Sequence, residues 1–274
     1  MILSALKPGS TKEWLLNPQR ILSKVNLANQ TGQSPPHTGN LSQAASISVD
    51  MEMDCPPFLS SSRGITEGLP RLLNLLSEEK IHATFFTTGE LARNWPDAIR
   101  SIVEAGHELA CHGNTHRSFK TLSAAEAREE IQRSTEALNR FSAPVSFRAP
   151  FLEFPNRYLP LLTEFGYVLD SSVARYKYPF RVRSHIEGLR RVPVSVTSSL
   201  LRLPEGIRDP ILLGLTAPVT LYVHPWEFAD LRAEALRLDC RFRTGPKAVR
   251  CLRTALRLLR QHGARFYRMR DLPG

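Results

Sequence analysis

The sequence has few cysteines and no long apolar runs. Its four cysteines form no CxxC pair and no small-domain disulfide pattern, which excludes the common cysteine-based zinc and redox motifs and indicates a reducing compartment. No run reaches the roughly 18–20 apolar residues of a membrane-spanning helix. The start of the chain also lacks the apolar core and cleavage site of a signal peptide. We therefore expect a soluble, cytoplasmic protein without a membrane span.

The charge of the chain is unbalanced, at +10 from 36 Lys and Arg against 26 Asp and Glu. Much of the excess lies after Arg232, where aromatic residues are not interleaved with the basic ones as a base-stacking surface requires. A solvated, arginine-rich helix face explains this pattern better than nucleic-acid binding does. We expect no nucleic-acid partner, and the sequence carries no signal for a particular oligomeric state.

The 274 residues divide into two segments of different composition. Residues 1–43 are rich in Ser, Gln, Asn, Pro and Thr without sustained periodicity, which predicts a flexible leader. From residue 44 to residue 272, short apolar runs alternate with amphipathic segments of helical period, and this alternation predicts one parallel α/β domain. A (β/α) barrel of about seven strands is favoured over an open sheet, because single barrels of this size are common.

Ionisable residues recur at the ends of the predicted strands. Strands are predicted at residues 46–50, 83–89, 107–112, 145–150, 167–172, 190–195 and 219–225, and helices around residues 69–76, 99–103, 131–138 and 249–259. Asp50, His112, Arg148, Asp170 and His224 each stand at or just after the C-terminal end of a strand. In a β/α barrel those ends converge on the face where active sites lie, so these residues are candidates for one pocket.

The stretch CHGNTHRSF places His112 and His116 four residues apart. If this stretch forms a helix or a helical loop, the spacing brings both imidazoles to the same side, within reach of one ion. The pair alone does not establish a metal site, because two ordinary polar histidines in a loop are the alternative.

The stretch SVDMEMD supplies acidic candidates for the same pocket. It carries Asp50, Glu52 and Asp54 at the end of the first predicted strand, where a period of two points all three carboxylates to one face. Three like charges repel one another, so a nearby cation or arginine is expected to offset them. A solvated strand end is the alternative interpretation.

Five segments of the chain follow one another in the order and approximate spacing of a known set of motifs. They are SVDMEMD, HGNTH, FRAPF, LDSS and LYVHPW. In this respect the sequence resembles the NodB-type polysaccharide deacetylases, which are metal-dependent hydrolases of N-acetyl groups. The resemblance covers about residues 44–272, and it implies the distorted barrel of that family and a role in carbohydrate metabolism.

The resemblance also implies catalytic roles for the matched residues. The first aspartate of the first motif is the general base in the family and corresponds to Asp50, and Arg148 corresponds to the arginine that pairs with it. His224 is similar to the catalytic histidine, and Asp170 to the aspartate that orients it. Phe151 stands where the family has a tyrosine whose backbone N–H donates to the oxyanion.

A divalent metal is implied as well, with His112 and His116 as two of its ligands. The family's metal-binding aspartate directly follows the base, but Met51 occupies that position here. Members that resemble peptidoglycan deacetylases and allantoinase-like enzymes space the two acids by one residue, which makes Glu52 the expected ligand and Asp54 the alternative. Zn²⁺ is the expected ion, with Co, Ni, Mn and Fe as alternatives.

These observations predict a metal-dependent hydrolase of non-peptide C–N bonds. Its first expected activity is N-deacetylation of an amino-sugar or polysaccharide, so the expected partner is a glycan or another small molecule. A ureide or cyclic amide hydrolase of the allantoinase-like type is the alternative within the same chemistry. A non-catalytic barrel that binds a glycan or an anionic partner is the alternative outside it. The missing secretion signal favours a small cytoplasmic substrate over a cell-wall polymer.

Overall fold

A computed structural model of the chain describes residues 43–56, 58–59, 61–177, 184–186 and 188–273. Apart from its last residue, the predicted leader, residues 1–43, lies outside this part of the chain. Within the described ranges, no helix combines the length and the apolar character that crossing a membrane requires.

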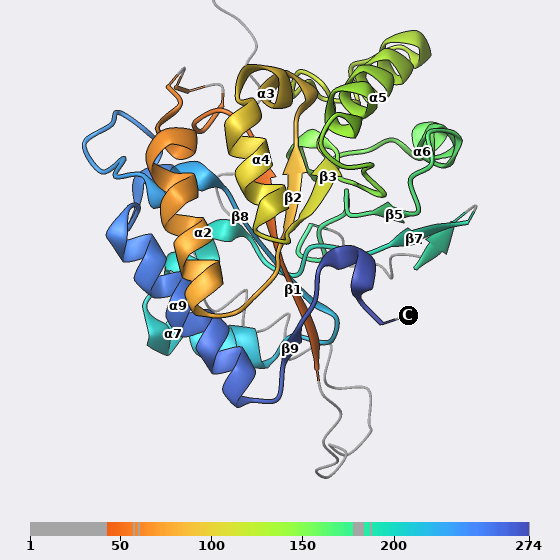
Figure 1. The fold of residues 1–274 in the computed structure, drawn as a ribbon. Coiled ribbons are helices and arrows are strands. Elements are labelled where there is room, and N and C mark those ends of the chain that lie inside the picture. Colours follow the sequence, from red (N-terminus) through yellow and green to blue (C-terminus); the bar gives the residue numbers. More distant parts are fainter. Residues whose placement is uncertain (1–42, 57, 60, 178–183, 187, 274) are drawn as a thin grey trace, which may run out of the picture. The chain divides into compact units, whose positions relative to one another are not determined.

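One curled sheet forms the centre of the domain (Figure 1). Its strands follow the order β6-β7-β5-β4-β3-β2-β1-β8, and β9 pairs with β1. Their bounds are β1 (Ala44–Met51), β2 (Thr84–Thr87), β3 (Glu108–Cys111), β4 (Ser146–Phe147), β5 (Leu169–Asp170), β6 (His185–Ile186), β7 (Leu189–Arg191), β8 (Val219–Val223) and β9 (Arg265–Phe266). All these pairings are parallel except the antiparallel pair β6–β7. The predicted parallel α/β architecture is confirmed, and the strands beyond the expected set are the two-residue strands β6 and β9.

The sheet is curled, so that the segment that follows β7 forms hydrogen bonds with β8. The backbone N–H of Ser195 donates to the carbonyl of Thr220 at 2.9 Å, and the Ser195 hydroxyl accepts from the Thr220 N–H at 2.9 Å. Val194 forms an isolated parallel bridge with Ala174. This side of the barrel is therefore closed by irregular chain, and the strand predicted at residues 190–195 ends at Arg191.

Helices pack along the outer face of the sheet, with α2 beside α9 (Figure 1). The π-helical turn η1 (Gly64–Gly68) is followed by the α-helices α2 (Leu69–Glu78), α3 (Gly89–Asn94), α4 (Pro96–Glu104), α5 (Ala124–Asn139), α6 (Leu159–Glu164), α7 (Glu205–Leu213), α8 (Leu238–Arg241) and α9 (Pro246–Gln261). Short turns are η2 (Pro150–Leu152), η3 (Asn156–Tyr158), η4 (Ser198–Arg202), η5 (Pro225–Phe228) and η6 (Met269–Asp271). The four predicted helices correspond to α2, α4, α5 and α9.

The alternation of residues along β1 decides which side chains reach the interior of the barrel. Ile47, Val49 and Met51 belong to the main apolar cluster beneath the helices. Burying side chains of this size contributes about 1.5–3 kcal/mol each to folding. Because successive side chains of a strand point to opposite faces, Ser48 and Asp50 face the other way. The position that follows the candidate base therefore belongs to the core, and Met51 fits it.

Candidate metal centre and catalytic site

The C-terminal ends of four parallel strands position the polar side chains of the site. Glu52 directly follows β1, His112 follows β3, Arg148 follows β4 and His224 follows β8. All four side chains are largely shielded from solvent. The parallel pairing of β1 with both β2 and β8 is what brings residues so distant in sequence to one end of the sheet.

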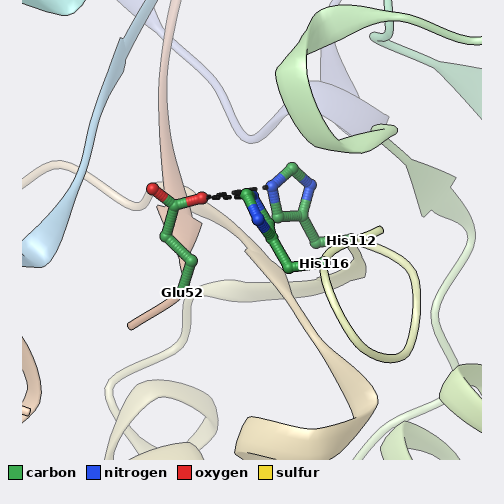
Figure 2. Close-up of side chains that lie close together, drawn as sticks. All are labelled: Glu52, His112 and His116. Carbon is green, nitrogen blue, oxygen red and sulfur yellow. Dashed lines mark ion pairs between the residues drawn. The ribbon is translucent and has the colours of Figure 1, made fainter. Parts of the chain in front are cut away.

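Glu52, His112 and His116 form a compact cluster, in which the carboxylate faces both imidazoles (Figure 2). Oε2 of Glu52 lies 2.5 Å from Nε2 of His116 and 3.8 Å from Nε2 of His112. The centres of the two imidazole rings are 5.3 Å apart. One ligand atom from each residue lies within 4.8 Å of the other two, which is close enough for a single ion to contact all three.

The hydrogen bonds of this cluster fit a metal-binding role. Nδ1 of His112 lies 2.8 Å from the backbone carbonyl of Arg148. Because a carbonyl can only accept, Nδ1 carries the proton, and Nε2, which faces Glu52, keeps the lone pair that a metal ligand needs. Two imidazoles and one carboxylate are also a ligand set typical of catalytic zinc sites, so the donors present fit a divalent ion.

The electrostatic surroundings keep Glu52 ionised. Burial alone would raise the pKa of this carboxyl group, but the charge of nearby His224 and the contacts with His112 and His116 hold the pKa well below its usual range. A buried carboxylate held in its charged form by imidazoles is suited to a cation, because an ion can take over the compensation of its charge.

The histidine stretch does not form the helix on which the spacing argument was conditional. His112 lies at the end of β3, and His116 is in a non-helical loop with a positive φ of 57°. Glu130 of α5 holds this loop, because its carboxylate accepts from the backbone N–H groups of Asn114 at 2.8 Å and Thr115 at 2.9 Å and from the Thr115 hydroxyl at 2.6 Å. The spacing of the histidines does not indicate that Glu130 binds this loop. The one sign in the sequence is that this acidic residue lies on the buried face of an amphipathic helix.

Asp50 is paired with Arg148 inside the domain. Nη1 of Arg148 donates to Oδ1 of Asp50 at 2.5 Å, and Nη2 donates to the Ser171 hydroxyl at 2.9 Å. The guanidinium also lies over the ring of Phe86, 4.1 Å from its centre. Arg148 is 0 % exposed, so each charge of this pair depends on the other for compensation.

Asp54, the alternative ligand, lies outside the cluster. Its Oδ2 accepts from the Ser61 hydroxyl at 2.6 Å and from the Arg63 N–H at 2.8 Å, and its Oδ1 accepts from the Gly64 N–H at 2.7 Å. The carboxylate thus binds the free N–H groups at the start of η1. Because β1 ends at Met51, the period-two alternation does not continue to this residue, and the structure favours Glu52 over Asp54.

Replacing Asp54 by Asn is therefore expected to destabilise the fold without removing the metal. One of its oxygens becomes an amide group that cannot accept, so buried donors at η1 lose their partner, which costs about 1–3 kcal/mol. Urea unfolding should show the lower stability, and elemental analysis should show the wild-type metal content. Loss of metal at unchanged stability would instead make Asp54 a ligand.

His224 faces the cluster from the end of β8. Its Nε2 lies 3.7 Å from Oε1 of Glu52, and its Nδ1 lies 2.9 Å from Oε1 of Glu227. Trp226 stacks on the imidazole with ring centres 4.9 Å apart at an angle of 20°. Burial opposes protonation of this ring, but the carboxylates of Glu52 and Glu227 raise the pKa of His224 to about 9.

Asp170 does not contact His224, and the orienting role that we predicted for it is wrong. Its Oδ2 lies 3.0 Å from Nε of Arg191 on the neighbouring strand β7, and its Oδ1 accepts from the Ser172 N–H at 2.9 Å. These partners hold the carboxylate at β5, and Glu227 stands beside the histidine instead. The sequence signal for Glu227 was its position three residues after His224, at which it completes a capping box around η5.

Phe151 lies at the edge of the cluster. Its ring centre is 4.9 Å from that of His116, the residue is 48 % exposed, and its carbonyl accepts from Nζ of Lys177 at 2.7 Å. Its backbone has a positive φ of 62°, which is uncommon for an aromatic residue and is typical of functional loops. The role of its N–H as an oxyanion donor stays a prediction.

Comparison with known protein sequences finds deacetylases among the similar proteins. A family model described as polysaccharide deacetylase matches residues 54–169. Residues of the chain are 31 % identical over 128 positions to the peptidoglycan deacetylase of Helicobacter pylori, a match that covers 44 % of each chain. The peptidoglycan-N-acetylglucosamine deacetylase of Bacillus cereus is 30 % identical over 105 residues, or 38 % of each chain. The chain thus spans less than half the length of these curated relatives.

Solved structures share the fold at lower identity. The Bc1960 peptidoglycan N-acetylglucosamine deacetylase superimposes with a TM-score of 0.60 at 20 % identity, over 85 % of this chain and 89 % of that one. BA3943, a CE4 family pseudoenzyme from Bacillus anthracis, superimposes with a TM-score of 0.59 at 16 % identity, over 85 % of this chain and 66 % of that one. The expected distorted barrel is confirmed by these matches, and the matches to the family model and to the curated deacetylases support the resemblance to NodB-type polysaccharide deacetylases.

Proposed function

We propose that this protein is a metal-dependent hydrolase that removes the N-acetyl group from an amino sugar of a glycan. The observation that carries the proposal is the cluster of Glu52, His112 and His116, with Asp50 and His224 beside it. The similarity to peptidoglycan deacetylases and to the chitooligosaccharide deacetylase of Bradyrhizobium, 33 % identical over 85 residues, supports an acetylated glycan as the substrate.

Glu52, His112 and His116 would hold the ion through Oε2 and the two Nε2 atoms. A divalent ion such as Zn²⁺ supplies Lewis acidity there, since it polarises a carbonyl group and lowers the pKa of water. Three protein ligands would leave a position open for water or substrate, as in catalytic zinc sites.

The charged side chains around the cluster divide the proton transfers of amide hydrolysis between them. Asp50, whose charge Arg148 compensates, accepts the proton of the attacking water. His224, whose pKa is raised to about 9, carries a proton that it donates to the leaving nitrogen. An amide needs such an acid, because an unprotonated amine is a poor leaving group.

A panel of acetylated and ureide substrates tests the proposed function. The metal-loaded protein is incubated with N-acetylated chitooligosaccharides, with peptidoglycan fragments and with allantoin, and released acetate and ammonia are measured. We expect acetate from the amino sugars and no hydrolysis of allantoin. Hydrolysis of allantoin alone would assign the ureide reaction, and inertness towards the whole panel at full metal content would indicate a binding protein.

A further inference from the structure

A chain of buried charged side chains extends from His224 away from the metal cluster. Oε1 of Glu227 lies 2.9 Å from Nδ1 of His224 and accepts from the backbone N–H of the same histidine at 2.9 Å. Its other oxygen, Oε2, forms an ion pair with Nε of Arg202 at 2.9 Å, without the alignment of a linear hydrogen bond. Both oxygens of the carboxylate are thus occupied, and Glu227 has no freedom to turn away from the imidazole.

Arg202 is itself fixed by backbone carbonyl groups. Its Nη1 donates to the carbonyl of Phe242 at 2.6 Å, and its Nη2 donates to the carbonyl of Asp239 at 2.6 Å. The side chain of Arg202 is 3 % exposed and that of Glu227 is 1 % exposed. Burying two charges is costly, and apolar residues of similar volume often give equal or greater stability. The contribution of the Arg202–Glu227 ion pair to fold stability therefore does not explain why both charges are buried here.

The geometry points to Glu227 and Arg202 as positioning residues for His224, an inference that rests on the proposed function. Because a carboxylate can only accept, Nδ1 of His224 carries a proton, and Nε2 is directed towards Glu52 and the metal cluster. Arg202 prevents Glu227 from changing its orientation. The first turn of η5 thus supplies the partner of the catalytic histidine.

The rings next to His224 support this assignment. Trp226 stacks on one side of the imidazole, and Tyr222 meets it edge-on with ring centres 5.4 Å apart. These contacts restrict rotation about the side-chain bonds, but an imidazole turned by half a turn fills the same space. The hydrogen bond to Glu227 distinguishes the two orientations, because only one of them directs Nε2 into the site.

The test compares two substrates that differ in their need for an acid. Glu227→Gln has nearly the shape of the wild-type side chain but lacks its charge. We expect this variant, loaded with zinc, to release acetate from a chitooligosaccharide with a kcat lowered roughly 10–100-fold and an unchanged KM. Hydrolysis of 4-nitrophenyl acetate should change little, because its leaving group departs without protonation. Equal loss on both substrates, or loss on neither, would contradict the positioning role.

Asp170→Asn is the matched control, since it makes the same chemical change at a buried carboxylate that binds Arg191 and Ser172 and does not contact His224. We expect it to leave the ratio of the amide and ester rates at the wild-type value. A second readout is independent of activity. The low-field proton resonance of His224 Nδ1–H, assigned by its absence in His224→Gln, should shift upfield in Glu227→Gln. An unshifted resonance would overturn the inference, whereas failure of the wild-type protein on all substrates would reject only the proposed function.

Discussion

Asp50→Asn is expected to lower the kcat of acetate release by about 10²–10⁴-fold, the range that general base catalysis typically contributes. The asparagine occupies the same volume but cannot accept the proton of the attacking water. The variant leaves the guanidinium of Arg148 buried without a charged partner, so a loss of stability on the order of 3–5 kcal/mol should accompany the loss of activity. Steady-state kinetics and urea unfolding measure the two effects separately.

The metal content of the variant shows whether activity is lost because the base is missing or because the metal site is damaged. The ligands Glu52, His112 and His116 are all retained in Asp50→Asn, so elemental analysis should find the wild-type amount of metal. Asp54→Asn makes the same chemical change four residues along the chain, at a carboxylate that binds Ser61 and the start of η1 instead of the metal cluster, and should keep most of the activity. Full activity of metal-loaded Asp50→Asn would show that another group acts as the base.

His116→Ala is expected to abolish both bound metal and activity. The substitution removes one of three ligands, and the remaining carboxylate and imidazole bind a divalent ion too weakly to keep it through purification. Elemental analysis and the acetate assay should both give background values. His82→Ala is the matched control, because it removes an exposed imidazole outside the cluster and should preserve metal and activity. Acetate release by metal-free His116→Ala would exclude the proposed role of the cluster.

Much of the fold could be predicted from local patterns. The apolar residues of α2, α4, α5 and α9 recur with the period of a helix, and the buried runs of β1 and β8 are bounded by turns. These six elements can therefore be predicted from the spacing of apolar residues alone. The C-terminal ends of parallel strands meet at one face, and this rule was sufficient to bring Asp50, His112, Arg148 and His224 into one region.

The partners of the charged groups could not be predicted in the same way. Asp54 continues the alternation of the acids in sequence, but β1 ends three residues earlier and a loop directs that carboxylate to η1. Asp170 is held by Arg191, whose position depends on the pairing of β5 with β7. Such contacts are set by the end of a strand or by a neighbouring strand, and no local period encodes them.

The most direct test of the central claim is a metal titration followed by activity. The wild-type protein is freed of metal with a chelator, Zn²⁺ is added in steps, and acetate release from an N-acetylated chitooligosaccharide is measured at each step. We predict no activity without metal and a linear rise to a plateau at about one equivalent per chain, because the three ligands form a single site. Acetate release at the full rate from the metal-free protein would contradict the account.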